Sequence, residues 1–152
     1  MSYPARWLKG DAYDGAGLFV RTGITKFSAN PSGAIDVSVQ ERRSSAQHTA
    51  LLDLADSVQI HQEGVVKFQR AQQMQVMETR PMTLADNPAL FTKDRYFDPL
   101  ERTSWMEEVI FASRGDELYR LELVCRADEV ERFERVFQRV VDSFSFGCAG
   151  TR

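Results

Sequence analysis

The stretch of residues 105–146 constrains the fold more than any other part of this chain. It begins with two runs of β-branched, aromatic and aliphatic residues, at 105–112 and 118–125, with Gly115 between them. Such runs favour strands, and a glycine can adopt the positive φ that a tight turn requires. The stretch therefore opens with a predicted β-hairpin.

The second strand of this hairpin predicts a sheet with one firmly apolar side, because alternate residues of a strand point to opposite faces. One face carries only apolar or weakly polar side chains: Tyr119, Leu121, Leu123 and Cys125. The other face mixes two apolar residues with a basic and an acidic one: Leu118, Val124, Arg120 and Glu122. We expect the first face to be buried and the second to be partly covered.

An amphipathic helix is predicted directly after the hairpin, because apolar residues recur at helical spacing while charged residues take the opposite face. The apolar stripe consists of six residues: Val130, Phe133, Val136, Phe137, Val140 and Val141. Asp128 and Glu131 have the spacing of a capping box at the start of this helix. The alternation in 143–146 predicts a short last strand, and 147–152 is expected to be a flexible tail.

Strands, a helix and further strands are predicted before the hairpin. Strand-like runs lie at 18–21, 24–27, 34–40, 65–68, 73–77, 79–84 and 89–97. A helix is expected from Ser44 or Ser45 to about Gln62, with Gly64 as its C-terminal stop. The order is therefore strands, helix, antiparallel meander and terminal helix.

The two histidines lie on or at the end of the first predicted helix, at His48 and His61. Thirteen residues of helix place them on different faces and about 20 Å apart along the axis. They cannot share one metal ion, so both are expected to face solvent. No metal site is predicted.

No catalytic constellation is predicted either. Glu107 and Glu108 are neighbours on a strand and therefore point to opposite faces, so they cannot form a dyad with each other. One of them could face Glu122 across the hairpin, but Arg102 and Arg120 are the expected partners of these carboxylates, which should be solvated. Without a nucleophile, carboxylate pair or open metal site, we expect no enzyme and no cofactor.

Composition bounds the class of protein. The 152 residues, 43% hydrophobic and 27% charged, suit one globular domain, and a net charge of −3 argues against a general nucleic-acid binder. No apolar run approaches the ~20 residues of a membrane span. Cys125 is expected to be a buried small hydrophobe and Cys148 a tail thiol, with a disulfide or a link to another chain as the alternative.

The pattern of elements resembles the PsbP-like α/β/α-sandwich superfamily. The resemblance rests on five segments: 3–7 (Tyr-Pro-Ala-Arg-Trp), 86–89 (Asp-Asn-Pro-Ala), 119–123 (Tyr-Arg-Leu-Glu-Leu), 136–137 (Val-Phe) and 142–146 (Asp-Ser-Phe-Ser-Phe). It implies an α+β fold, a single domain over residues 1–146 with a mainly antiparallel sheet flanked by helices. The superfamily includes extrinsic photosystem II subunits, a Ran regulator, bacterial lipoproteins and effector chaperones, which share non-enzymatic binding.

This resemblance predicts a non-catalytic accessory protein, a monomer or homodimer, that engages a protein partner through the sheet face or rim. Arg95, Tyr96, Trp105 and Arg120 are the candidate interaction residues, because interfaces favour arginine and aromatic side chains. The alternative is a small-molecule or lipid-binding protein with an apolar pocket between sheet and helix. An exported or periplasmic location, with a leader that this sequence lacks, is favoured over a cytoplasmic one.

Overall fold

In the part of the chain that the structure describes, the fold is a seven-stranded antiparallel sheet with one long helix on each face. The computed structural model describes residues 7–11, 17–22, 33–41, 50–68, 71–115 and 117–146. Within these ranges the elements are β1 (Trp7–Asp11), β2 (Gly17–Thr22), β3 (Gly33–Glu41), α1 (Ala50–Phe68), β4 (Gln72–Leu84), β5 (Asn87–Asp98), β6 (Thr103–Arg114), β7 (Glu117–Arg126) and α2 (Val130–Asp142). The strand order is β1-β2-β3-β7-β6-β5-β4.

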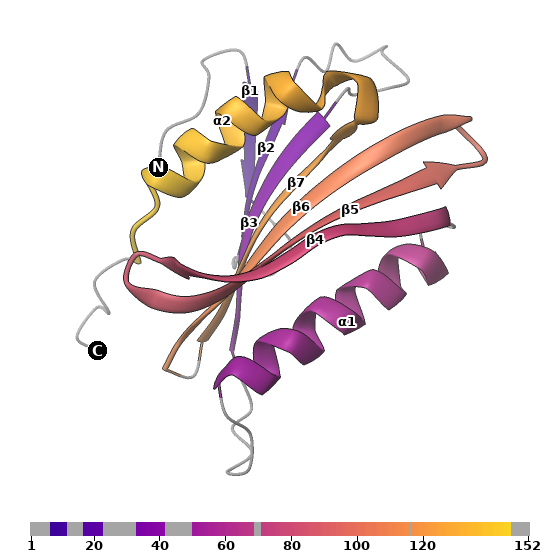
Figure 1. The fold of residues 1–152 in the computed structure, drawn as a ribbon. Helices are drawn as coiled ribbons and strands as arrows, with labels where there is room; N and C mark the ends of the chain where they lie inside the picture. The colour runs from indigo at the N-terminus through magenta and orange to yellow at the C-terminus, as the bar shows by residue number, and fades with distance from the viewer. Residues whose placement is uncertain are drawn as a thin grey trace.

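The two helices flank opposite faces of this sheet, as Figure 1 shows with α1 in purple and α2 in yellow. Helix α1 contacts β5 and β6, whereas α2 contacts β7. The predicted α/β/α sandwich with an antiparallel sheet is therefore confirmed. Neither helix is long and apolar enough to cross a membrane.

The predicted hairpin is present and longer than its apolar runs. Strands β6 and β7 pair from Trp105 with Arg126 to Arg114 with Glu117, and Gly115 in the turn has a φ of +57°. Upstream, the predicted segments 73–77 and 79–84 form a single strand, β4, with two register shifts against β5. A β-bulge inserts an extra residue without ending a strand. The alternation of side chains is therefore interrupted between the two predicted segments, although both belong to one strand.

The main core lies between the sheet and α2. Leu121 and Leu123 of β7 are fully buried, and Phe133, Phe137 and Val140 of α2 are at most 3% exposed. The apolar stripe of the helix therefore docks on the apolar face of the hairpin, as predicted. Strand β3 passes so close beneath α2 that a Cβ atom at Gly33 would lie 2.8 Å from the Phe133 ring.

Both predictions at the ends of α2 are wrong. A 3₁₀ turn (Ala127–Glu129) precedes the helix, and the helix begins without a side-chain cap. Asp128 lies within this turn and not at the N-cap of α2, which is Glu129, and its carboxylate accepts hydrogen bonds from the Arg126 guanidinium at 3.2 and 3.3 Å. Residues 144–146 form no strand.

The two terminal phenylalanines instead cover the end of the core. The rings of Phe144 and Phe146 pack edge-on against Tyr119, with centroids 6.1 and 4.5 Å from it. Phe144 and Phe146 therefore contact the core by ring packing, without pairing as a strand. The predicted tail, 147–152, lies outside the described residues.

Helix α1 continues beyond its predicted stop. It passes through Gly64 to Phe68, so the expected strand at 65–68 is wrong. Leu54, Val58 and Val65 form one stripe and are 0%, 6% and 2% exposed. Burying Val65 outweighs the ~1 kcal/mol that a glycine costs inside a helix. The expected N-terminal part of the helix, 44–49, lies outside the described residues and includes His48.

Candidate functional site

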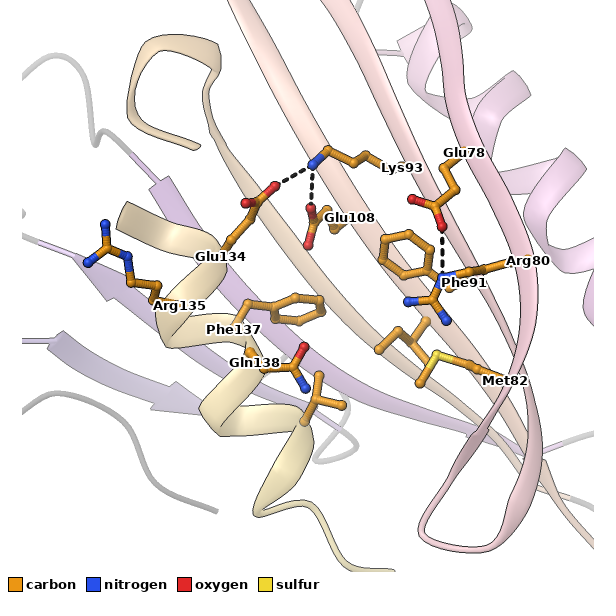
Figure 2. A pocket seen from close by; sticks show the side chains of 12 residues that line it. Glu78, Arg80, Met82, Phe91, Lys93, Glu108, Glu134, Arg135, Phe137 and Gln138 are labelled. Atoms are coloured by element: carbon orange, nitrogen blue, oxygen red, sulfur yellow. Dashed lines mark hydrogen bonds and ion pairs between the residues drawn. The ribbon is translucent and has the colours of Figure 1, made fainter. Parts of the chain in front are cut away.

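A groove lies between α2 and the β4–β6 part of the sheet face on which α2 packs (Figure 2). Its volume is about 410 Å³. Side chains from three strands and the helix line it: Glu78, Arg80 and Met82 of β4, Phe91 and Lys93 of β5, Glu108 and Ile110 of β6, and Glu134, Arg135, Phe137, Gln138 and Val141 of α2. The groove exists because α2 packs on the central strand β7 and leaves part of the same face of β4, β5 and β6 uncovered.

The floor of the groove is apolar. Phe91, Ile110 and Phe137 are 7%, 2% and 3% exposed, and Met82 and Val141 are half-buried beside them. The Arg80 guanidinium lies 4.7 Å from the centroid of the Phe91 ring, in cation–π geometry. An apolar side chain could therefore be buried between α2 and the strands.

The charges around this floor pair with one another. Lys93 lies between two carboxylates: its Nζ is 3.1 Å from Glu108 and also contacts Glu134. Arg80 pairs with Glu78 at 2.8 Å. Figure 2 shows both groups at the rim, with Glu108 and Lys93 adjacent on paired strands. The rim is therefore close to neutral and favours an uncharged or amphipathic occupant.

Burial changes the acid–base behaviour of this rim. Burial is the main cause that raises the pKa of Glu108 to about 7, against the opposing attraction of Lys93. Burial also acts to lower the pKa of Lys93, but its two carboxylate neighbours outweigh this and raise it. The pKa of Glu134 is lowered, because Lys93 outweighs the opposite effect of burial. Lys93 and Glu134 are thus charged at pH 7, whereas Glu108 is partly protonated.

The raised pKa of Glu108 predicts a pH dependence of stability. The folded state binds this proton more tightly than the unfolded state, so the stabilisation is present at low pH and is lost as the pH rises toward about 7. Glu108→Gln should remove this loss. Between pH 5 and pH 8, the wild type should lose on the order of 1–3 kcal/mol more than the variant in urea unfolding.

A control variant isolates this effect. Glu131→Gln changes an exposed residue of α2 and should follow the wild type. Other buried acids with raised pKa values, such as Glu122 and Asp94, contribute equally to all three proteins. Parallel stability curves for the wild type and Glu108→Gln would contradict the assignment.

A second hollow, of about 510 Å³, lies on the same face near the start of α2. It contains three arginines, Arg95, Arg102 and Arg126, and is also lined by Met77, Thr103, Ser104, Met106, Ala127, Asp128 and Val130. Arg126 pairs with Asp128 at 3.2 Å. No described acidic side chain forms an ion pair with Arg95 or Arg102, so this hollow is electropositive.

The two hollows adjoin one another. Lys93 and Arg95 are two residues apart on one face of β5, as are Glu108 and Met106 on β6. Two residues of strand span about 7 Å. One elongated ligand could therefore contact both the apolar floor and the arginines.

The four candidate interaction residues do not share one surface. Arg95 lines the electropositive hollow on the α2 side. The neighbouring Tyr96 points to the α1 side, where it is 4% exposed and packs with Val65 and the half-buried Trp105. Arg120 is on that side too, with its Nε 3.3 Å from Glu122. Alternation along β5 separates Arg95 from Tyr96, so any interaction through them would use different faces.

The groove residues were not predicted, although the sequence contains one signal for them. Phe91, Lys93 and Arg95 alternate on one face of β5, so charged residues share that face with an apolar one. In a half-covered sheet, such a face is typical of the edge of a docked helix. The position of the helix edge depends on tertiary packing and could not be read from the spacing alone.

His61 is buried against the sheet, so the expectation that it faces solvent is wrong. Its side chain is 9% exposed and its Nε2 lies 3.1 Å from Oε1 of Glu107. The residue belongs to the buried stripe of α1, between Val58 and Val65. The expectation of solvated carboxylates is also wrong: Glu107 is fully buried and Glu108 is 7% exposed.

No protein-family model matches the chain, and no curated protein sequence matches it. Solved structures do match its fold. PA94 from Pseudomonas aeruginosa, a protein of unknown function, has a TM-score of 0.64 at 10% identity, over 93% of this chain and 98% of that one. LpqN from Mycobacterium tuberculosis, which is involved in cell envelope biogenesis, has a TM-score of 0.66 at 13% identity, over 94% and 79%.

The cyanobacterial PsbP of Synechocystis sp. PCC 6803 matches as well. Its TM-score is 0.58 at 14% identity, over 93% of this chain and 81% of that one. Identities this low establish a shared fold and not a shared activity. The chain has the PsbP-like α/β fold that its sequence pattern predicted.

Proposed function

We propose that this chain is a non-enzymatic accessory protein that binds a segment of a partner protein in the groove between α2 and strands β4–β6. One observation carries the proposal: an apolar floor adjoins an electropositive hollow on the same sheet face. A binding module needs a buried anchor site and a polar site that orients the ligand. This face offers both.

The geometry indicates the chemistry of the bound segment. An apolar side chain would enter the groove over Phe91 and Ile110, where little polar surface has to be desolvated. An acidic side chain about 7 Å along the segment would meet Arg95 and Arg102. The proposed partner segment therefore carries an apolar residue next to an acidic one.

The fold relatives support an accessory role by analogy only. LpqN is involved in cell envelope biogenesis, and this supports an exported or periplasmic location for the present chain. The location is part of the proposal. A homodimer remains compatible with it, provided that the groove stays accessible.

A second candidate is a small amphipathic molecule in the same groove. The volume of about 410 Å³ favours it, because it lies within the ~300–1,000 Å³ of small-molecule sites. Native mass spectrometry of the purified protein, compared with its denatured mass, separates the two. A small added mass that disappears on denaturation would favour this second candidate.

Peptide selection tests the proposal directly. Peptides selected from a random displayed library on the immobilised protein should share an apolar residue next to an acidic one. Gln138 is exposed on α2 and lines the groove, so Gln138→Trp should obstruct it. We expect this variant to weaken a selected peptide at least about tenfold in fluorescence polarisation, which corresponds to about 1.4 kcal/mol.

The next residue of the helix provides the matched control. Arg139 is also exposed but lies outside the groove lining, so Arg139→Trp should change the affinity less than about twofold. Equal losses in the two variants would show that the peptide binds elsewhere. A library that yields no shared apolar–acidic pattern would also contradict the proposed segment.

A further inference from the structure

A cluster of metal-ligating side chains lies on the other face of the sheet, beneath α1, and plays no part in the groove. It consists of His61 from α1, Glu107 from β6 and Glu122 from β7. One ligand atom of each lies within 4.8 Å of the others. Three separate elements of regular structure therefore direct a nitrogen and two carboxylate groups toward one point.

The backbone explains why these residues meet. Glu107 pairs with Val124 and Glu122 pairs with Val109, so the two glutamates are diagonal neighbours on the same face of β6 and β7. Helix α1 crosses this face and buries His61, whose ring packs edge-on against Phe111 at 5.8 Å. Positions on strands and a packed helix are well fixed, as a preorganised site requires.

Glu107 provides a second, independent observation. It is fully buried, yet neither of its carboxylate oxygens has a hydrogen-bond partner in the part of the chain that the structure describes. The Nε2 atom of His61 likewise forms no well-formed hydrogen bond, and its contact with Oε1 of Glu107 at 3.1 Å is an ion-pair contact. A buried carboxylate in this state is costly unless a cation compensates it.

We propose that His61, Glu107 and Glu122 bind one divalent transition-metal ion, with Zn²⁺ as the first ion to test. A mixed set of imidazole nitrogen and carboxylate oxygens suits such ions better than Mg²⁺ or Ca²⁺, which prefer oxygen ligands alone. In a tetrahedral site, two ligands at ~2.0–2.2 Å from one ion are roughly 3.3–3.6 Å apart. The 3.1 Å between His61 Nε2 and Glu107 Oε1 is a few tenths of an ångström shorter, so a small side-chain movement would accommodate the ion.

The charges around the cluster match a divalent cation. Glu107, Glu122 and the nearby Asp94, which interacts electrostatically with His61, supply three carboxylates. Arg120 supplies one positive charge, with its Nε 3.3 Å from Oε2 of Glu122. With the His61 imidazole neutral, the three carboxylates and the Arg120 guanidinium have a net charge of −2, which a divalent cation would balance. Asp94 is itself held by Gln62, whose Nε2 donates to both carboxylate oxygens at 3.1 Å.

Such an ion would tie α1 to two central strands. Its ligands come from one helix and two strands that are far apart in sequence, so bound metal should stabilise the docked position of α1. The site faces away from the groove, because Glu107 and Glu108 point to opposite faces of β6. Metal binding and partner binding can therefore be tested separately.

Calorimetric titration of the tag-free, chelator-treated protein with Zn²⁺ tests the proposal. We expect one ion per chain and a higher melting temperature with Zn²⁺. Glu107→Gln and His61→Asn should each weaken binding at least about 100-fold, because even outer-shell substitutions cost up to that much. Co²⁺ bound at this site should give the visible absorption of a cobalt ion with a low coordination number. This absorption should be lost in Glu107→Gln and in His61→Asn.

Matched variants keep the test decisive. Glu108→Gln alters the next residue of the same strand, on the opposite face, and should leave Zn²⁺ affinity within about threefold. His48→Ala accounts for the second histidine and should behave in the same way. If Glu107→Gln fails to fold by circular dichroism, Glu122→Gln replaces it. Absence of saturable Zn²⁺ binding, or binding that survives both ligand substitutions, would overturn the proposal.

Discussion

Replacing Phe137 with alanine is expected to lower the free energy of unfolding by about 3–5 kcal/mol. The side chain is 3% exposed and belongs to the core between α2 and the sheet. Alanine would leave a cavity that the surrounding strands cannot fill, because they are fixed by their neighbours in the sheet. Urea unfolding followed by circular dichroism measures the change.

Gln138→Ala is the control for this substitution, since it removes an exposed side chain from the next position of the same helix. It should change stability by less than about 0.5 kcal/mol. A loss below about 1 kcal/mol for Phe137→Ala would contradict the docking of α2. Without that docking, the groove would lose one of its walls.

Leu54→Ala is expected to cost about 2–5 kcal/mol, which tests the opposite face. Leu54 of α1 is fully buried and packs with Val58 of the same helix and with Val109 and Phe111 of β6. Its removal should loosen α1 from β5 and β6. The same unfolding experiment measures the loss.

Ile60→Ala is the matched control on α1. Ile60 is 69% exposed, so its truncation should change stability by less than about 0.5 kcal/mol. Equal losses for the two substitutions would mean that α1 does not bury the face that contains Leu54. The proposed metal cluster depends on the same docking.

The sequence predicted the fold where its periodicity was strong and local. The strand face with Leu121 and Leu123 was expected to be buried, and so was the helical stripe with Phe133 and Phe137. The two surfaces pack against each other in one core. The ends of elements were less predictable, because they depend on competing contacts. The Asp128 carboxylate, which was expected to cap α2, instead binds the Arg126 guanidinium. Helix α1 continues through Gly64 because this buries Val65.

The site was largely beyond prediction, because it is formed by tertiary packing. The groove depends on how far α2 extends across the sheet, which no spacing in α2 reveals. Arg95 and Tyr96 are a different case: alternation along a strand already assigns neighbours to opposite faces. His61 could have been assigned to the buried stripe if α1 had been extended beyond Gly64.

Photo-crosslinking in cells that produce the protein tests the central claim most directly. A photoreactive amino acid is placed at Gln138, inside the groove lining, or at Arg139, outside it. We predict that position 138 captures one partner protein through a segment with adjoining apolar and acidic residues, and that position 139 does not. No protein captured at 138, or equal capture at both positions, would contradict the groove as the binding site.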